Sequence, residues 1–482
     1  MKGYEKFISK EAAAKIHEAT LRIFRDTGVQ FENDKAIEIF KEHGVKTDGY
    51  RVYIDEATVE KALKTLPSTF DVRITADKTV TFGKDAQLRM PIAHPAFYCN
   101  EKGEIKKMNT EYALRQFKMN ESCSITNCSM ANLAILYDAK PTKEQMIFGT
   151  AAIRYMFSNK WHVGTGEYTN GLTPEEAYKA SVDGLELMRR FKGIEPGTGT
   201  YAVSGINPLS PLTFDNIPLS RLMASSEHNL PMLIAPCAMP ILTAPPSLAG
   251  LLAQTNAEVL AAMVFMQLIN PGLPAVYANV SGATDMRTLQ LCLGSPETAL
   301  IGYAAAAMAD FYHVPFRMGG GMGDSKQVDA QAGAESFMML YATYDCKPDY
   351  ALHTAGCMGA MNVFSCEKYI LDEEVANYVQ RMLRGVNVTD KTLCEKEIAE
   401  TGPRGTYLKG RTPKVYREDF YLSQLFDKDD PNNWQNNGAK TILEKAHEEA
   451  DRRIAAYTPP ALDKEQIELL TPYVPARFLK EF

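Results

Sequence analysis

The chain has 482 residues, 45% of them hydrophobic and 23% charged, which is enough apolar sequence for one large core with additions. Its 52 basic and 59 acidic residues are spread along the sequence with a formal charge of -7, so we expect no nucleic-acid partner. The longest apolar stretch, 259–269, is too short to span a bilayer and the first residues lack a signal-peptide pattern, so we expect no membrane partner and a cytoplasmic location.

The first part of the chain, residues 1–120, is predicted to be a helical and β-hairpin extension of the main fold. Apolar residues recur at helical spacing in three places, which predicts helices over 10–27, 34–43 and 55–66. The segments 71–76 and 79–83 alternate by twos around a short polar turn, which predicts a hairpin.

From about residue 121 to 390 a β-type run, a polar loop and a long helix repeat in turn. Such units give parallel strands joined by crossover helices. Eight strands are predicted, over 124–127, 161–164, 199–204, 231–235, 275–279, 313–318, 350–353 and 386–388. The pattern favours an α/β fold, a TIM (β/α)8 barrel, over an open doubly wound sheet, because no Gly-x-Gly-x-x-Gly follows the first strand.

The remaining residues, 391–482, are predicted to form a C-terminal helical arm. A charged helix is predicted over 441–456, and an apolar tail follows over 466–482. Such an arm packs on its own barrel or on a neighbouring subunit. Because the tail is apolar, we expect a homo-oligomer.

Reactive groups of a TIM barrel lie where strands end and loops begin. The loop after 313–318 is the most informative, since four glycines between 319 and 323 remove Cβ atoms where a flat partner could approach. The chain has no Walker-type loop, no His-Glu-x-x-His and no Gly-x-Ser-x-Gly elbow. Phosphoryl transfer, zincin chemistry and α/β-hydrolase chemistry therefore lose support.

His353, Cys357 and Cys366 fall close together and are residue types that zinc binds. The two cysteines lie among apolar residues, however, where free cysteine behaves as a small buried hydrophobe. Nine cysteines without dense spacing also fit free thiols. We expect no metal site and no disulfides.

Aromatic residues near predicted strand ends form a second constellation: Phe97, Tyr98, Trp161, Tyr168, Tyr201, Phe214 and Phe364. Each one alone is more typical of core or rim packing. Together, stacked ring faces attract a quaternary ammonium group. His94, His162 and His353 are candidates for polar walls or for binding a carboxylate.

Several long motifs occur in one order over nearly the whole chain. They are Asn207-Pro-Leu-Ser-Pro-Leu212, Leu248-Ala-Gly-Leu-Leu-Ala-Gln-Thr-Asn-Ala-Glu258, Gln267-Leu-Ile-Asn-Pro-Gly-Leu-Pro274, Asp285-Met-Arg287, Gly319-Gly-Gly-Met-Gly-Asp-Ser-Lys326, Asp329-Ala-Gln-Ala-Gly-Ala-Glu335 and Glu367-Lys-Tyr-Ile-Leu-Asp372. With these motifs the chain resembles the trimethylamine methyltransferase superfamily, in its branch without pyrrolysine, the quaternary-amine (betaine):corrinoid protein methyltransferases. The segment 331–333 offers no amine nucleophile, which disfavours trimethylamine as the substrate.

The resemblance implies an enzyme that moves a methyl group from glycine betaine, proline betaine, carnitine or γ-butyrobetaine to Co(I) of a cognate corrinoid protein. The corrinoid is carried by that partner, so we expect no tightly bound cofactor here. A quaternary nitrogen leaves as a neutral amine, so the reaction needs no general acid and no Lewis-acid metal, and positioning dominates.

The chemistry that the resemblance implies suggests a role for several of the residues at strand ends. The ammonium cage is expected from Tyr98, Tyr168 and Phe364, with Trp161 or His162, and the substrate carboxylate is expected on Arg317 and His353. The ordering groups of the catalytic site are expected to be Asp324, Asn207, Glu258 and His353. For Asp324 and Glu258 an ion pair or a helix cap is an equal alternative. The corrinoid is expected to face Gly319, Gly320, Gly321 and Gly323.

Two other functions remain open from the sequence. One is a TIM-barrel lyase or isomerase without a cofactor, acting on a small acid with Asp324 as base. The other is a non-catalytic subunit that binds betaine and docks the corrinoid protein. Methyl transfer to cobalt, read in visible spectra, separates both from the main hypothesis.

Overall fold

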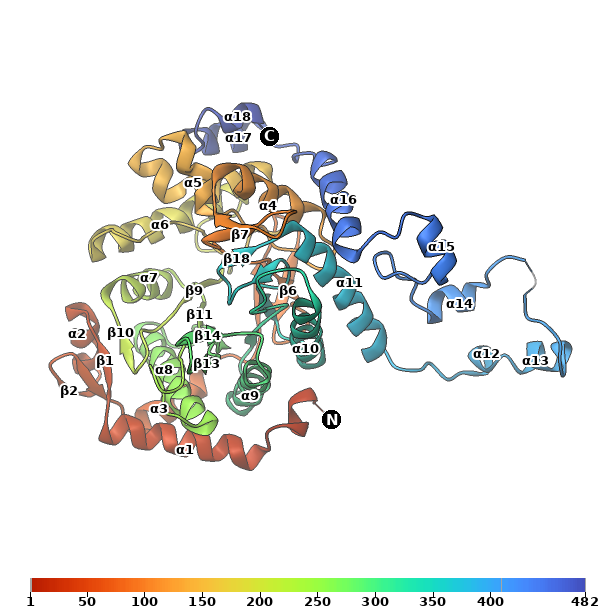
Figure 1. The fold of residues 1–482 in the computed structure, drawn as a ribbon. Coiled ribbons are helices and arrows are strands. Elements are labelled where there is room, and N and C mark those ends of the chain that lie inside the picture. Colours follow the sequence, from red (N-terminus) through yellow and green to blue (C-terminus); the bar gives the residue numbers. More distant parts are fainter. Residues whose placement is uncertain (1, 409, 482) are drawn as a thin grey trace.

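The computed structural model describes residues 2–408 and 410–481, with a parallel β-sheet at the centre (Figure 1). Its strands follow the order β6-β16-β15-β12-β11-β9, and every neighbouring pair is parallel. They are β6 (Leu88–Arg89), β9 (Ser204–Ile206), β11 (Met232–Ile234), β12 (Ala275–Ala278), β15 (Phe316–Gly319) and β16 (Tyr350–Leu352). The described sheet is a half-barrel of six strands rather than the predicted closed barrel of eight.

Two short extended segments lie between the edge strands β6 and β9. The amides of Asn127 and Cys128 donate to the Arg89 carbonyl, at 3.0 and 3.1 Å. Cys128 and Trp161 form a parallel bridge, and the Val203 amide donates to the Val163 carbonyl at 3.1 Å. Backbone hydrogen bonds thus continue from one edge of the sheet to the other.

The predicted strands 231–235, 275–279 and 350–353 are confirmed, and 199–204 and 313–318 overlap strands that extend further along the chain. The prediction 161–164 holds only the bridge at Trp161 described above, and 124–127 ends one residue before its partner Cys128, in a turn and loop. The prediction 386–388 is wrong, since this segment is a loop. β6 was missed because two residues are too few to show an alternation. It lies within 1–120, so that part of the chain supplies an edge strand of the main sheet.

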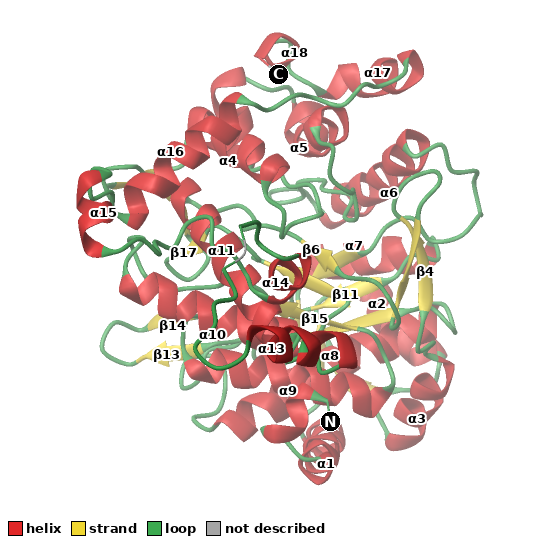
Figure 2. Ribbon diagram, turned by 90° about the vertical axis from the view of Figure 1, so that its right-hand side faces the viewer, coloured by secondary structure: helices red, strands yellow, loops and turns green. Residues whose placement is uncertain are grey.

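Helices surround the sheet (Figure 2). They are α5 (Lys143–Phe157), α6 (Pro174–Phe191), α7 (Asn216–Glu227), α8 (Leu248–Ile269), α9 (Pro296–Tyr312), α10 (Ala330–Cys346) and α11 (Cys366–Leu383). Local signals start them: Thr173 caps α6 by accepting the Glu176 amide, with Pro174 in the first turn. By length and composition α8 is able to cross a membrane, but its apolar window is 78% buried inside the protein, as in a core helix.

The N-terminal extension is close to its prediction. It contains η1 (Gly3–Lys6), α1 (Lys10–Asp26), β1 (Val29–Phe31), α2 (Asp34–Glu42), β2 (Lys46–Asp48), β3 (Arg51–Tyr53), α3 (Glu56–Thr65) and the hairpin β4 (Phe70–Arg73) and β5 (Thr79–Phe82). The three predicted helices and the hairpin are confirmed. A small sheet, β10-β1-β3-β2, was missed because its strands are two or three residues long; β10 is Thr213–Phe214.

The hairpin closes the end of the central sheet at which the strands begin. Val72 and Phe82 are fully buried in one cluster with Leu88, Val203 and Val276. The Lys192 ammonium ties this end together by donating to the carbonyls of Arg73, His162 and Tyr201, at 3.0, 2.7 and 2.7 Å. This end of the sheet is therefore filled by packed side chains, so a ligand site is expected at the carboxyl ends of the strands.

Smaller elements complete the body. They are β7 (Phe97–Cys99), β8 (Ile105–Lys107), α4 (Thr110–Ser122), η2 (Leu133–Ala139), the hairpin β13 (Ala283–Asp285) and β14 (Gln290–Cys292), and β17 (Cys357–Met358) and β18 (Val363–Phe364). The order β17-β18-β7-β8 makes a separate sheet.

The C-terminal part both packs on the body and leaves it. It contains α12 (Asp390–Leu393), α13 (Glu395–Thr401), α14 (Lys414–Asp419), α15 (Pro431–Asn436), α16 (Ile442–Ala455), α17 (Lys464–Leu470), η3 (Thr471–Tyr473) and α18 (Phe478–Glu481). The predicted helix 441–456 is confirmed as α16. The apolar tail packs on its own chain, with Leu470 and Phe478 fully buried, whereas α12 and α13 project from the body (Figure 1).

Candidate active site

A cavity of about 460 Å³ opens at the carboxyl ends of the central strands. Its walls combine apolar side chains with a few polar ones. The lining includes Met90, Ala93, His94, Met130, Val203, Asn207, Arg221, Leu233, Ala235, Cys237, Val280, Arg317, Tyr350, Leu352, His353 and Met361. Four predicted residues, His94, Asn207, Arg317 and His353, therefore meet in one cavity.

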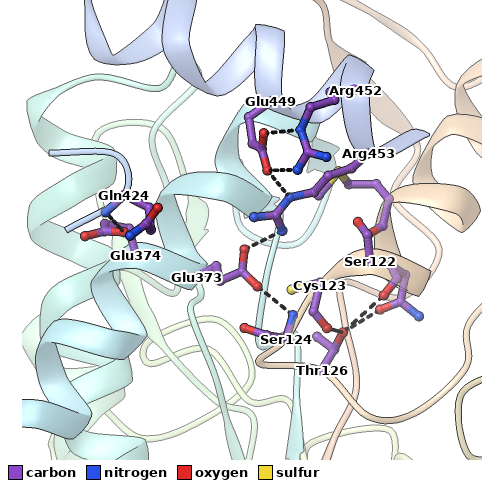
Figure 3. A network of polar contacts seen from close by, with 12 residues as sticks. Ser122, Cys123, Ser124, Thr126, Glu373, Glu374, Gln424, Glu449, Arg452 and Arg453 are labelled. Carbon is purple, nitrogen blue, oxygen red and sulfur yellow. Dashed lines mark hydrogen bonds and ion pairs between the residues drawn. The ribbon is translucent and has the colours of Figure 1, made fainter. Parts of the chain in front are cut away.

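A larger cleft of about 1030 Å³ lies between α4, α11 and α16. Figure 3 shows its polar network, in which Arg453 bridges Glu373 and Glu449, and Glu373 also accepts the Ser124 amide at 2.6 Å. Most charged groups there satisfy one another. We therefore place the functional site in the smaller cavity, which holds an unpaired charge.

Arg317 supplies that charge from β15. It is 1% exposed, and among the described residues neither its Nε nor its Nη1 has a hydrogen-bond partner. Burial lowers the pKa of the guanidinium to about 10, so it remains a cation at neutral pH. A buried charge without a partner is costly, and an anion that entered the cavity would satisfy it.

His353 lies beside this guanidinium at the end of β16. Its Nδ1 accepts the Ala93 amide at 3.3 Å. Burial, the Arg317 charge and His94 lower the pKa of His353 to about 3, so the ring is neutral at physiological pH. The cavity therefore presents a neutral imidazole beside the Arg317 cation, rather than an acid and a base.

Three residues that line the cavity have a left-handed backbone: His94 (φ 47°), His353 (φ 61°) and Met361 (φ 71°). Such conformations are unfavourable for residues other than glycine, and they persist where the surrounding structure holds them. Arg221 also lines the cavity, with its Nε 3.6 Å from Glu167 Oε1. Arg221 and Met361 were not predicted, since no motif sets them apart.

Glu258 and Asp324 hold loops at the mouth and do not line the cavity. Glu258 Oε2 accepts the Ser210 hydroxyl at 2.7 Å, and Oε1 accepts the Leu212 amide at 2.9 Å. The Asp324 carboxylate accepts the amides of Leu293 and Gly294, at 2.8 and 2.9 Å. Their contacts therefore match the alternative of a structural role.

The expected aromatic cage does not line the cavity either. Tyr98 stacks on Tyr112 with ring centroids 3.4 Å apart, and Phe364, fully buried, packs edge-on against Tyr369 at 5.7 Å. These two belong to the separate sheet, where they are register partners. Apolar aliphatic and methionine side chains form much of the walls instead, together with Tyr350.

The other cage candidates also point elsewhere. The Lys78 ammonium lies over the Trp161 ring, with Nζ 4.0 Å from the ring centroid. His162 is buried with its Nδ1 2.7 Å from the Ser129 hydroxyl, and burial lowers its pKa. Tyr168 follows the segment, and its amide donates to the Ile147 carbonyl at 2.8 Å. None of the three lines the cavity.

The glycine turn has an internal reason for its composition. Gly319, Gly320, Gly321 and Gly323 are all buried. A Cβ at Gly320 would meet the Thr354 backbone, and one at Gly323 would lie 2.9 Å from a Glu335 oxygen. The turn therefore packs against its own chain, which argues against the expected corrinoid-facing surface.

Metal ligands do not gather in the part of the chain that the structure describes, where no group of three or more His, Cys, Asp or Glu side chains is placed to hold an ion. Cys357 and Cys366 are buried as free thiols.

The sequence matches the trimethylamine methyltransferase (MTTB) family over residues 3–480. It is 33% identical to an L-carnitine:corrinoid methyltransferase of Eubacterium limosum, covering 98% of this chain and 97% of that protein. A proline betaine:corrinoid methyltransferase of the same organism is 34% identical, with 98% of each covered. A glycine betaine methyltransferase of Desulfitobacterium hafniense is 33% identical, with 95% and 94% covered.

Among solved structures, the monomethylamine methyltransferase of Methanosarcina barkeri aligns over 95% of both chains, with a TM-score of 0.45 and 13% identity. The three relatives above are named for quaternary amine donors, two of them together with a corrinoid. On the match over residues 3–480, this chain belongs to the trimethylamine methyltransferase family.

Proposed function

We propose that the protein transfers a methyl group from a quaternary amine that carries a carboxylate to Co(I) of a separate corrinoid protein. One observation carries this proposal: Arg317 lies buried in the cavity with two guanidinium nitrogens unsatisfied. A betaine carboxylate is the anion that fits, because a guanidinium binds a carboxylate through two parallel hydrogen bonds. The relatives named for carnitine, proline betaine and glycine betaine support this donor class.

The surroundings suit the reaction. The N–methyl bond breaks with its electron pair remaining on nitrogen, which becomes a neutral tertiary amine, while Co(I) supplies the pair of the new Co–C bond. The positive charge on nitrogen fades in the transition state, so a carboxylate close to it would stabilise the ground state more. Met90, Met130 and the neutral His353 give walls without such a charge.

The competing lyase or isomerase hypothesis is less well supported. A general base must reach a substrate proton. Asp324 accepts two backbone amides and does not line the cavity, and His353 is held neutral with its Nδ1 occupied. A subunit that only binds betaine is separated from the enzyme by experiment.

Two further proposals concern the closure of the barrel and the location of the protein in the cell. We propose that β6, the segments 127–129 and 161–163, and β9 continue the sheet into an eight-stranded TIM barrel, because hydrogen bonds join each to the next. We also propose that the protein works in the cytoplasm, where a reduced corrinoid protein is available.

Assembly is a further part of the proposal. Ten of the 24 exposed large apolar side chains among the described residues fall between Met382 and Leu422. Val386 and Leu408 are 85% and 86% exposed, and no residue of α12 or α13 is buried. We propose that residues 382–422, called the arm from here on, pack on a second copy of the chain, since exposed apolar patches of this kind mark protein interfaces.

The test mixes the protein, a reduced corrinoid protein and single donors, and follows conversion of Co(I) to methyl-Co(III) by visible absorbance. Glycine betaine, proline betaine, carnitine and γ-butyrobetaine are compared with trimethylamine. At least one betaine is expected to react and trimethylamine is not. Donor binding by calorimetry without any spectral change would leave the non-catalytic subunit as the better description.

A further inference from the structure

We propose that five exposed apolar residues beside the cavity, the rim patch, form the surface on which the corrinoid protein docks. The rim patch consists of Leu209, Ile241, Leu242, Met286 and Leu289, which are 60%, 56%, 45%, 50% and 51% exposed. This inference rests on the proposed function, because that function requires the corrinoid protein to reach the cavity mouth.

The rim patch lies on loops that begin at the cavity. It lies on the loops that follow β9, β11 and β12, three neighbouring strands of the central sheet. Asn207, Cys237 and Val280, which start these loops, line the cavity. Parallel strands place their carboxyl ends on one edge, so these loops lie on the side from which an acceptor must enter.

The backbone presents two of these side chains at a cost. Ile241 and Leu289 have φ values of 71° and 56°. A β-branched or bulky residue in this region is an outlier, and glycine or asparagine would be relaxed there. Neither side chain gains burial in return, so neither fold stability nor backbone geometry explains an apolar residue at these positions. An apolar contact with a partner protein would explain both residues.

The loops are held together before any partner arrives. The Thr284 hydroxyl donates to the Pro240 carbonyl at 2.9 Å, and the Ala238 amide donates to the Ser281 hydroxyl at 2.9 Å. Gln254 Nε2 donates to the Thr243 carbonyl at 2.9 Å and to Glu258, which holds the loop of Leu209. A pre-organised surface loses little conformational freedom on binding.

A second copy of this chain is the less suitable occupant. Its presence on the rim patch would cover the mouth through which both the donor and the acceptor must pass. The arm around Val386 offers a different surface for self-association, and it leaves α11 at Leu383. Helices that follow strands of such a sheet run back toward the strand starts, so α11 ends away from the mouth.

The decisive variant is the double substitution Ile241→Asn and Leu289→Asn. Asparagine tolerates the left-handed backbone better than isoleucine or leucine, so folding should be unimpaired or improved while the apolar contact is lost. The matched control is Ile467→Asn on α17, another exposed residue (44%) remote from the rim patch in the sequence. Binding to the corrinoid protein is measured by surface plasmon resonance, with Tm as the test of folding.

The double variant is expected to weaken corrinoid-protein binding by about tenfold or more, since two half-exposed apolar side chains lose their contact. Methyl transfer to free cob(I)alamin, which needs no docking surface, should stay unchanged, as should calorimetric binding of the betaine. Unchanged binding of the corrinoid protein would contradict docking on the rim patch, and so would a change in oligomeric state without a change in that binding. Either result would leave the proposed methyl transfer intact. No methyl transfer from any donor to free or protein-bound corrinoid would overturn the proposed function as well.

Discussion

Arg317 and Tyr350 are register partners on β15 and β16, and both line the cavity. The Tyr350 hydroxyl is directed at the Met90 sulfur, so it does not satisfy the neighbouring guanidinium. Strand pairing thus places a phenol beside the cation without using up its hydrogen-bond donors. The positive charge of Arg317 remains available to a ligand.

Arg317→Gln should weaken binding of carboxylated donors by about 10- to 150-fold, corresponding to roughly 1.5–3 kcal/mol for charge-assisted hydrogen bonds. Tetramethylammonium, which has no carboxylate, should bind both proteins alike by calorimetry. The variant should also have a higher Tm than the wild type, because an unpaired buried charge has been removed. Equal losses for both ligands would contradict a carboxylate contact.

The lowered pKa of His353 should make the stability of the fold depend on pH. Its pKa is about 3 in the folded chain and about 6.5 when unfolded, so between these values only the unfolded chain binds the proton. The free energy of unfolding should therefore fall as the pH falls below 6.5, by up to about 1.4 kcal/mol per pH unit.

The His353→Asn variant lacks this proton uptake. Between pH 6.5 and 5 the wild type should lose about 2 kcal/mol more than the variant, measured by urea denaturation. His43→Asn, at an exposed position after α2, is the control and should follow the wild type. Parallel curves for wild type and His353→Asn would disprove the prediction.

Glu258 is a positioning residue for the mouth loops. Glu258→Ala removes acceptors for Ser210, Leu212 and Gln254, and should lower the free energy of unfolding by roughly 2–4 kcal/mol. Glu258→Gln, which keeps one carbonyl oxygen, should cost less. Methyl transfer to the corrinoid protein should fall further than transfer to free cob(I)alamin, because the loop of Leu209 loses its support. A fall in both rates by the same factor would argue for a role in the chemistry itself.

Lys368 and Asp372 form a fully buried ion pair at 2.5 Å, and Asp372 also accepts the Gly356 amide at 2.8 Å. Asp372→Ala leaves Lys368 as an unpaired buried charge and should cost about 3–5 kcal/mol by chemical denaturation. The double variant Lys368→Met with Asp372→Leu should recover much of that loss. A double variant as unstable as the sum of the two single variants would show that the charges stabilise the fold independently.

Charged substitutions in the arm should change the oligomeric state of the protein. Val386→Asp with Val388→Asp should shift the protein toward monomers in analytical ultracentrifugation, because charges oppose burial of the arm. Asn387→Asp lies between the two valines and adds a charge without removing an apolar side chain, so it should assemble as the wild type does. A monomeric wild type would refute packing of the arm on a second copy.

Regular features of the fold were predictable where the local signal is strong. In the helices of the extension, apolar residues recur at the spacing that places them on one buried face. In the hairpin β4–β5, apolar and polar residues alternate strictly. β6 was not predicted, and the predicted strand 161–164 forms only one bridge, to Cys128, because so short an extended segment shows no period. The sequence suggested self-association through the apolar tail, but the tail buries Leu470 and Phe478 on its own chain. The proposed contact with a second copy therefore uses the arm.

The candidate site was predicted in part. Asn207, Arg317 and His353 lie at strand ends or within strands, and chain order alone brings such positions to one mouth. The aromatic cage failed to gather there because Tyr98 and Phe364 pair in a different sheet. Which sheet a strand of two or three residues joins depends on contacts between distant parts of the chain.

By itself, the amino-acid sequence determined the family, the parallel α/β pattern and several of the polar residues that line the cavity, because ordered motifs and local periodicity are written along the chain. Only the tertiary structure decided that Arg317 has no partner, that Glu258 and Asp324 hold loops, and that His94, His353 and Met361 take left-handed backbones. These properties depend on which atoms meet across long separations, and the packing of the whole core sets those meetings.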